Sequence, residues 1–220
     1  MLQNYKHIIW DWNGTLFDDT WLCVSVINGL LARRNLPTLT IETYRAIFTF
    51  PVRDYYQTIG LDFGQDSFED LSIEFMAQYE ARRNECTLYP HARSALTHIK
   101  QAGPGQSILS AYPHHDLVNV VRRFELENFF ERLVGLGDIY ATSKVELGQN
   151  WMRELGHAQS EVLLIGDTVH DFEVAQAIGA DCILVAGGHN SKERLHQCDV
   201  RVVDSLQEIV VTNCMSSRGT

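Results

Sequence analysis

Four short stretches of this sequence place reactive side chains directly after apolar runs. In residues 8–19, I-I-W-D-W-N-G-T-L-F-D-D, Asp11 ends the first of these runs. Gly14 and Thr15 then allow a sharp turn and offer backbone N–H groups. A carboxylate in this place can act as a nucleophile, and the simpler interpretation is an aspartate that closes a loop.

The other three stretches add a hydroxyl, a cation and an acidic pair. Ser110 follows Ile108-Leu109 and could bind an anion or close a turn. Lys144 lies at the start of a predicted helix, where a lysine holds an anion as a point charge or remains solvated. In residues 162–171, V-L-L-I-G-D-T-V-H-D, Asp167 and Asp171 stand four residues apart. Such carboxylates suit Mg²⁺ or cap a helix.

A parallel sheet would bring these residues together. Short apolar runs predict strands at residues 6–10, 106–109, 133–136, 162–165, 182–185 and 200–203, and amphipathic runs predict helices at 92–101, 116–124, 147–155 and 171–178. This alternation indicates an α/β fold with a doubly wound, Rossmann-like parallel-sheet core. Since such sheets bind ligands at the carboxyl ends of their strands, the four stretches could form a nucleophile, an anion clamp and a magnesium site.

One segment interrupts the alternation. Between Asp18 and Leu88 the sequence predicts no strand and four helices, at residues 20–34, 41–48, 53–59 and 67–83. Asp18, Thr40 and Ser67 are possible N-caps of these helices. We therefore expect an α/β core of residues 1–17 and 89–214, an inserted helical domain of residues 18–88 and a flexible tail of residues 215–220.

Charge and composition narrow the possible partners. The 220 residues carry a formal net charge of -10, which argues against binding to nucleic acid or anionic membranes. No apolar run approaches the roughly 20 residues that a membrane-spanning helix needs. The five cysteines are scattered and form no C-x-x-C pair, and the first residues carry no signal-peptide pattern. These features favour reduced thiols in a cytoplasmic protein and disfavour a zinc site.

In the order of these motifs the sequence resembles the haloacid dehalogenase-like superfamily of phosphohydrolases. The matching stretches are Asp11-Trp12-Asn13-Gly14-Thr15-Leu16, Ser110, Lys144 and Gly166-Asp167-Thr168-Val169-His170-Asp171. The resemblance covers nearly the whole chain, and its layout is similar to that of the phosphoglycolate phosphatase-like members. The helical insert corresponds to the cap domain of that group.

The resemblance implies roles for the matching residues. Asp11 would attack phosphorus, and Mg²⁺ would be held by Asp11, the backbone carbonyl of Asn13, Asp167 and Asp171. The phosphoryl group would be bound by Asn13, Gly14, Thr15, Ser110, Ala111 and Lys144. The implied function is the Mg²⁺-dependent hydrolysis of a small phosphorylated metabolite by a monomer or homodimer.

Asn13 departs from the family pattern. The usual residue there is a second aspartate, which donates a proton to the leaving group, and an amide cannot do so. General acid–base catalysis is worth roughly 10²–10⁴-fold in rate. Three interpretations stay open: a phosphatase with another proton carrier or with good leaving groups, a phosphotransferase or slow switch, and a binding or regulatory protein. The histidines that could carry the proton are His114, His115 and His170.

Two other activities of the family fit less well. Phosphonate-cleaving members use a lysine of the cap, but residues 17–90 contain no lysine. Dehalogenases lack the acidic pattern of residues 166–171, so that activity is a minor alternative. Within the cap, Arg53 could bind a substrate carboxylate or second phosphate, or could form an ordinary salt bridge. The aromatic residues around it fit a cap core better than a stacking platform.

Overall fold

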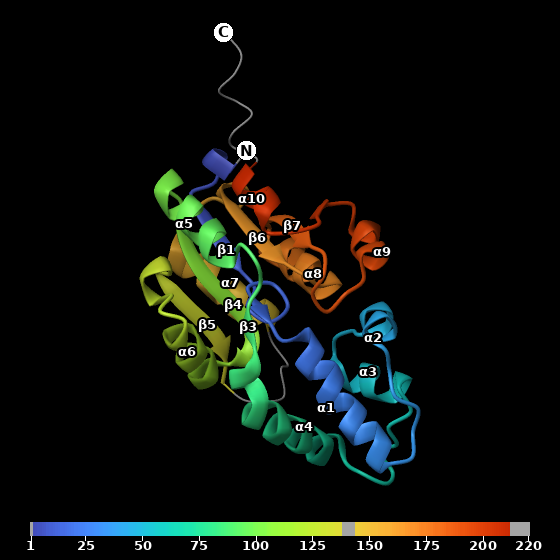
Figure 1. Cartoon of the computed structure of the whole chain (residues 1–220). Coiled ribbons are helices and arrows are strands. Elements are labelled where there is room, and N and C mark those ends of the chain that lie inside the picture. Colours follow the sequence, from blue (N-terminus) through green and yellow to red (C-terminus); the bar gives the residue numbers. More distant parts are fainter. Residues whose placement is uncertain (1, 138–143, 212–220) are drawn as a thin grey trace.

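Six parallel strands form the central sheet of the protein (Figure 1). The computed structural model describes residues 2–137 and 144–211. Along the sheet the strand order is β5-β4-β1-β6-β7-β8. The strands are β1 (His7–Trp10), β4 (Gly105–Pro113), β5 (Arg132–Leu136), β6 (Val162–Gly166), β7 (Asp181–Val185) and β8 (Arg201–Val203). The predicted α/β fold with a parallel-sheet core is confirmed.

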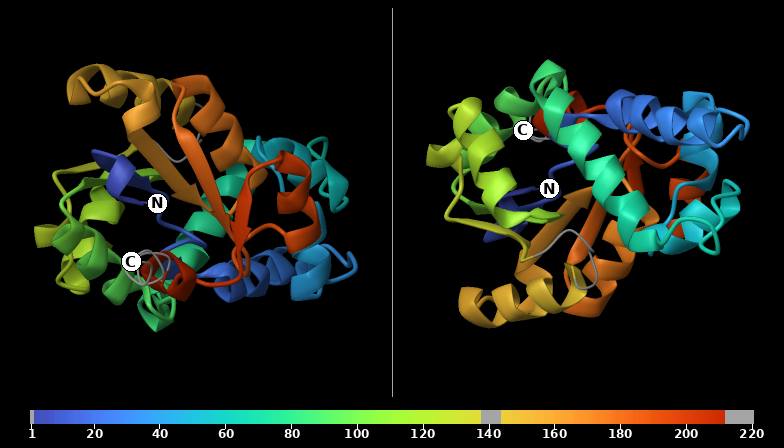
Figure 2. Two further views of the ribbon diagram at one scale, coloured as in Figure 1. Left: turned by 90° about the horizontal axis from the view of Figure 1, so that it is seen from above. Right: turned by 90° about the horizontal axis from the view of Figure 1, so that it is seen from below.

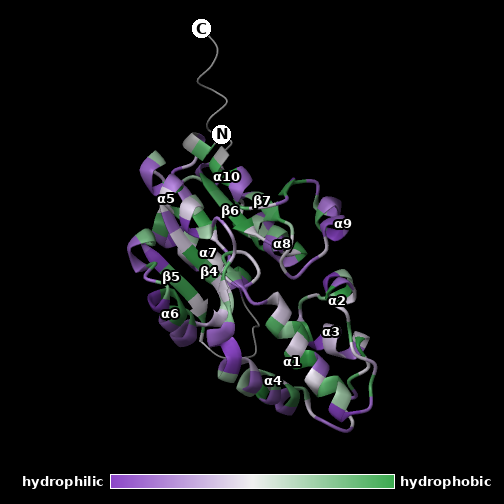
Figure 3. Ribbon diagram, viewed as in Figure 1, coloured by the Kyte–Doolittle hydropathy of each residue, from purple (hydrophilic) through white to green (hydrophobic). Residues whose placement is uncertain are grey.

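Helices cover both faces of this sheet (Figure 2). They are α5 (Ala92–Ala102), α6 (His114–Arg123), α7 (Lys144–Leu155), α8 (Val169–Ile178), α9 (Lys192–Leu195) and α10 (Gln207–Val211), with short 3-10 turns at Leu2–Asn4, Glu127–Phe129, Gln159–Glu161 and His196–Cys198. Ile8 and Trp10 of β1 pack into one hydrophobic cluster and Ile9 into another. Because successive strand residues face opposite sides, a strand covered on both faces is apolar throughout. Figure 3 shows this apolar character along the central strands.

A helical segment separates β1 from the rest of the core. Its helices are α1 (Thr20–Arg33), α2 (Ile41–Ile47), α3 (Val52–Thr58) and α4 (Phe68–Arg82), followed by a 3-10 turn at Arg83–Glu85. Thr40 and Ser67 cap α2 and α4, accepting hydrogen bonds from the N–H groups of Thr43 and Asp70. The predicted cap at Asp18 is wrong, since Asp19 precedes α1 and Asp18 lies in a strand.

That strand is part of a small ribbon that the sequence does not predict. β2 (Phe17–Asp18) pairs antiparallel with β3 (Thr87–Leu88), one strand on each side of the helical segment. Two residues are too few for an alternating pattern to be visible in a sequence. The ribbon joins the helical segment to the core through two adjacent chain crossings.

Two further predictions about the core need correction. β4 continues to Pro113, so Ser110 lies within this strand rather than directly after it. The pairing of β4 with β5 shifts register between Leu109 and Pro113, which lets the extended backbone continue beyond the regular ladder. α6 begins at His114 instead of Asp116.

The helical segment contacts the core on two sides. On one side the Arg45 guanidinium donates to the carbonyl groups of Gly188, at 2.8 Å, and Gly187. On the other, the guanidinium of Arg83 donates at 2.9 Å to the Tyr112 hydroxyl and to Asp116. Of the described helices, none is both long and apolar enough to cross a membrane. The predicted tail, residues 215–220, lies outside the described residues.

Candidate active site

Asp11 and Lys144 form the centre of the site. Asp11 follows β1 directly, and Lys144 is the first residue of α7. The Lys144 Nζ lies 2.5 Å from Asp11 Oδ1 and 2.5 Å from Asp171 Oδ1. Burial disfavours the charge of Lys144, but the two carboxylates outweigh this effect and raise the lysine pKa. Lys144 is therefore a buried cation held between two acids.

Three buried carboxylates lie close together at this point. Ligand atoms of Asp11, Asp167 and Asp171 all lie within 4.8 Å of one another. Asp167 accepts hydrogen bonds from Thr15 Oγ1 at 2.7 Å and from the His189 backbone N–H at 2.6 Å. Burial raises the pKa of Asp11 well above its usual range and that of Asp167 to about 6. The residues predicted from separate strand ends are thus brought together.

Asp171 accepts more hydrogen bonds from the described residues than Asp11 or Asp167 does. Oδ1 accepts from Lys144, and Oδ2 accepts from the Thr168 hydroxyl at 2.7 Å and from the N–H groups of Thr168 and Asp167. Burial alone would raise the pKa of Asp171, but the charge of Lys144 lowers it below the usual value. Asp171 is therefore an ionised group that orients Lys144 and the start of α8.

The donor set fits a magnesium ion. Three carboxylates face one ammonium group, which leaves an excess of buried negative charge, and carboxylate oxygens are the ligands that Mg²⁺ prefers. Glycines allow the backbone to approach Asp167 closely. A Cβ at Gly14 (φ +79°) would lie 2.4 Å from Asp167 Oδ2, and one at Gly188 would lie 2.1 Å from the same atom.

Asn13 turns its amide toward residues near the helical segment. Its Nδ2 donates to Asp19 Oδ2 at 2.8 Å and to the Tyr79 hydroxyl of α4 at 3.0 Å. Its Oδ1 accepts a long hydrogen bond, 3.4 Å, from Ser110 Oγ. An aspartate in the same rotamer would place a second carboxylate against Asp19. The amide at position 13 therefore suits the buried acid at position 19.

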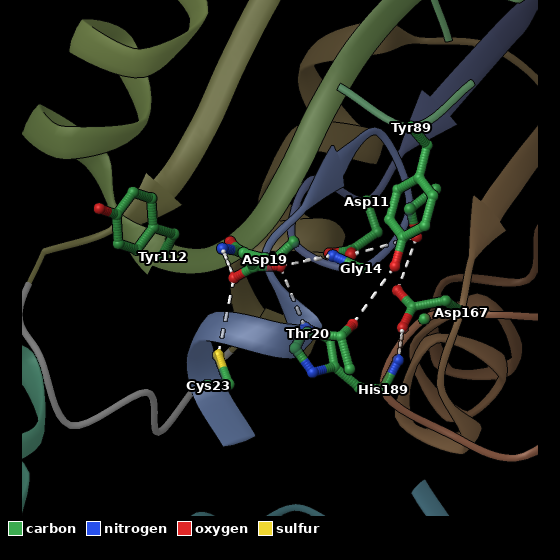
Figure 4. Close-up of polar contacts among 12 residues, drawn as sticks. Asp11, Gly14, Asp19, Thr20, Cys23, Tyr89, Tyr112, Asp167 and His189 are labelled. Carbon is green, nitrogen blue, oxygen red and sulfur yellow. Dashed lines mark hydrogen bonds and ion pairs between the residues drawn. The ribbon is translucent and has the colours of Figure 1, made fainter. Parts of the chain in front are cut away.

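A buried ion pair, not predicted from the sequence, completes the site (Figure 4). His189 Nε2 lies 3.4 Å from Asp19 Oδ1, and Asp19 also accepts from the Gly14 N–H and the Tyr79 hydroxyl. Burial lowers the pKa of His189, but its hydrogen bond to Asp19 and the charge of that group raise the value to about 9. Burial opposes ionisation of Asp19, yet the charge of His189 lowers its pKa below the usual value. The hydroxyl of Tyr44 in α2 contacts the other ring nitrogen at 2.9 Å.

Some predicted residues lie elsewhere. The guanidinium of Arg53 lies over the rings of Phe63 and Phe68, 4.7 and 5.4 Å from their centroids, and does not line the central cavity. The three candidate histidines also lie outside that cavity. Among them, His115 bonds to Asn119 and His170 to Glu173 on their own helices.

A cavity of about 180 Å³ connects the carboxylates with the helical segment. Asp11, Lys144 and Asp171 line one part, together with Ser110 and Ala111. Side chains of α1 to α4 and of the loop between α2 and α3 line a second part. The cavity therefore has a charged part at the sheet edge and a second part formed by the helical segment.

Comparison with known proteins identifies the family of this chain and solved structures with the same fold. A family model described as haloacid dehalogenase-like hydrolase matches residues 8–185. A phosphoglycolate phosphatase of Pseudomonas savastanoi pv. phaseolicola is 22% identical over 217 residues, which cover 93% of this chain and 78% of that protein. A tyrosine-protein kinase of Mycobacterium tuberculosis is 24% identical over 198 residues, covering 89% and 67%. The solved structure of a haloacid dehalogenase-like family hydrolase from Streptococcus pneumoniae has the same fold, with a TM-score of 0.81, 18% identity and coverage of 94% and 98%.

Proposed function

We propose, from the premise that this chain is a phosphatase belonging to the haloacid dehalogenase-like hydrolase family, that it hydrolyses small phosphomonoesters through a phosphoryl group carried on Asp11. The observation that carries the proposal is the buried bridge from Lys144 to Asp11 and Asp171. It holds a carboxylate at the floor of a cavity, next to a fixed cation. That is the pairing a phosphoryl acceptor needs, because the transferred group is itself an anion.

The proposed reaction has two steps. A carboxylate oxygen of Asp11 attacks phosphorus, and the bond from phosphorus to the ester oxygen breaks as the leaving group departs. Water then attacks the phosphorus of the aspartyl-phosphate, which releases inorganic phosphate and restores Asp11. Lys144, the Ser110 hydroxyl and the N–H groups of Asn13 and Ala111 hold the phosphoryl oxygens during both steps. Contacts from Gly14 and Thr15 to the phosphoryl group would replace the hydrogen bonds that these residues form with Asp19 and Asp167.

Mg²⁺ would be held by Asp11, Asp167 and the backbone carbonyl of Asn13. Asp171 would be a ligand of the ion or would lie next to a ligand. It already accepts four hydrogen bonds, which favours the second role. When bound, Mg²⁺ supplies positive charge that neutralises the phosphoryl oxygens. The binding of small phosphorylated metabolites, the cap (18–88) and core (1–17, 89–214) boundaries, the cytoplasmic location and the monomeric or homodimeric state remain predictions.

Asp11→Asn tests the nucleophile. The variant keeps the size of the side chain but loses the attacking charge, so phosphate release from 4-nitrophenyl phosphate with Mg²⁺ should fall at least ~10³-fold. Acid-quenched wild-type protein should carry one phosphate adduct by mass spectrometry, which the variant lacks. Asp54→Asn, which changes an exposed carboxylate of α3, is the matched control and should keep full activity. Activity that survives Asp11→Asn would refute the assignment.

Phosphoryl transfer to another acceptor is the second candidate function. Asn13 cannot act as a base for the hydrolytic water, and its amide is engaged by Asp19 and Tyr79. A slowly hydrolysed phospho-Asp11 could pass its phosphoryl group to an alcohol instead. A burst of 4-nitrophenol followed by slow turnover, accelerated by added alcohols with formation of their phosphate esters, would favour this alternative over simple hydrolysis.

A further inference from the structure

The part of the cavity formed by the helical segment is apolar. Its lining includes the partly buried side chains of Phe48, Phe50, Val52, Phe68, Phe75 and Met76. Phe48 and Phe50 pack edge to face at 5.4 Å, and Phe48 packs against Tyr55 at 5.2 Å. Such a surface gains free energy by removing apolar ligand area from water and offers aromatic faces to a ring.

The basic residues of the helical segment do not line this cavity. Arg45 binds carbonyl groups of the core, and Arg53 lies over Phe63 and Phe68. The remaining four form ion pairs, Arg33 with Glu74, Arg34 with Asp66 and Glu74, Arg82 with Glu85, and Arg83 with Glu80 and Asp116. None of these six arginines lines the cavity.

The cationic groups that do line the cavity are already paired. Among the described residues these are Lys144, held by Asp11 and Asp171, and His189, held by Asp19. Residues 138–143, D-I-Y-A-T-S, contain no lysine or arginine. A second negative charge on a ligand would therefore be desolvated among aromatic side chains without a free cation, which is costly.

We propose that the leaving group of the substrate is an uncharged aromatic alcohol, so that this phosphatase acts on aryl phosphates whose ring lies against Phe48, Phe75 and Met76. Apolar cavities of about 150 Å³ accept one benzene ring. This cavity measures about 180 Å³ with its charged part included, which limits the leaving group to a single ring. The inference rests on the proposed function.

Asn13 fits the same class of substrate. A phenolate is a weak enough base to leave without a proton from the enzyme, whereas an alkoxide is not. The phosphoryl group moves to Asp11 as the phenolate departs, water then cleaves the aspartyl-phosphate, and the phenolate takes its proton from solvent. An aromatic leaving group therefore removes the need for the acid that position 13 lacks.

Two matched pairs of substrates separate charge from leaving-group chemistry. Phenyl phosphate and 4-carboxyphenyl phosphate both release phenolates, and benzyl phosphate and phosphoglycolate both release alkoxides. With Mg²⁺, we expect kcat/KM to favour the uncharged member of each pair by at least ~10-fold, mainly through KM. Equal or reversed preferences would overturn the inference while leaving the phosphatase function intact.

Absence of turnover on all four substrates would instead refute the proposed function. The cavity is then tested by calorimetry with two ligands that cannot be hydrolysed, phenylphosphonate and phosphonoacetate. Tighter binding of phenylphosphonate supports an apolar binding site. Equal or weaker binding refutes it.

Two variants locate the preference in the cavity. Met76→Arg places a cation in the lining and should shift the ratio of kcat/KM for phenyl over 4-carboxyphenyl phosphate at least ~10-fold toward the charged substrate. Ile73→Arg is the matched control, because Ile73 lies on the same helix, is 53% exposed and does not line the cavity. An unchanged ratio in folded Met76→Arg would contradict the proposal.

Discussion

At the scale of single residues, Asn13 is understood through Asp19. The Asn13 amide donates a hydrogen bond to the buried carboxylate of Asp19, which is also the charge partner of His189. A second acid at position 13 would repel Asp19 at a separation close to the present 2.8 Å, and a buried pair of carboxylates raises the pKa of one member. The free-energy cost of a second buried carboxylate next to Asp19 is therefore enough to explain why position 13 holds an amide.

Asn13→Asp should therefore change stability and turnover in opposite directions. The new carboxyl, held protonated by Asp19, could donate to a leaving group, so turnover of benzyl phosphate should rise ~10-fold or more. Crowding of two acids should lower the free energy of unfolding by about 1–3 kcal/mol. Steady-state kinetics and urea unfolding measure the two effects.

The double variant Asn13→Asp/Asp19→Asn controls for the repulsion. It exchanges the amide and the carboxylate and keeps one hydrogen bond between them, so part of the lost stability should return. Unchanged benzyl phosphate turnover in both variants would show that proton supply does not limit the reaction.

The sequence predicts one kind of site residue and misses another. Asp11 and Asp167 could be predicted because each follows a strand of one parallel sheet, and Lys144 because it begins a helix that packs on this sheet. Asp19 follows a two-residue strand, and His189 lies in a loop after β7, so only the tertiary fold brings them together. The adjacent pair Asp18-Asp19 and the run Gly187-Gly188-His189 were the available signals.

At the scale of secondary-structure elements, a buried histidine connects β1, β4 and α7. His7 Nε2 lies 2.8 Å from Ser107 Oγ, and this oxygen accepts a hydrogen bond from Trp151 Nε1 at 2.9 Å. The other ring nitrogen lies 3.7 Å from Glu131, whose side chain is 62% exposed. Burial, together with the charge of His157, lowers the pKa of His7 to about 4.

Acid should therefore weaken the protein through His7. The unfolded chain binds a proton at this residue near pH 6.5, while the folded chain does so near pH 4. Stability from this group is present above pH 6.5 and lost as the pH falls toward 4, by on the order of 2–3 kcal/mol. Urea unfolding of His7→Asn should show a smaller loss between pH 7 and pH 4.5 than wild type.

The exposed His196 supplies the control for this experiment. His196→Asn removes a histidine of the surface and should keep the wild-type dependence on pH. Identical pH dependence for His7→Asn and wild type would show that His7 does not report on folding.

At the scale of the whole molecule, one loop joins the helical segment to the cluster of carboxylates at the edge of the core sheet. Residues 186–191 follow β7, and the N–H of His189 binds Asp167. The same loop accepts from Arg45 and donates through Asn190 Nδ2 to the Phe48 carbonyl at 2.9 Å. The parallel core could be predicted from the alternating apolar runs, but this contact could not, because no local pattern records which loop a helix touches.

Arg45→Ala should loosen this contact. Loss of the hydrogen bonds from this charged donor should weaken the contact between α2 and residues 186–191 by about 1.5–3 kcal/mol. KM for phenyl phosphate should rise about 3- to 10-fold, and amide hydrogen exchange in α2 should become faster. Arg33→Ala removes a surface ion pair with Glu74 and should change neither. Unaltered exchange in α2 of Arg45→Ala would contradict a role of Arg45 in holding the segment.

The shared loop has a thermodynamic consequence. Residues 186–191 contact Asp167 and also Arg45 and Phe48. A divalent ion at the proposed site and a ring in the apolar cavity would therefore both act on the same stretch of backbone. Linkage then requires reciprocity: the factor by which the ion tightens binding of the ring is the factor by which the ring tightens binding of the ion. A ring that does not touch the ion would thus bind cooperatively with it.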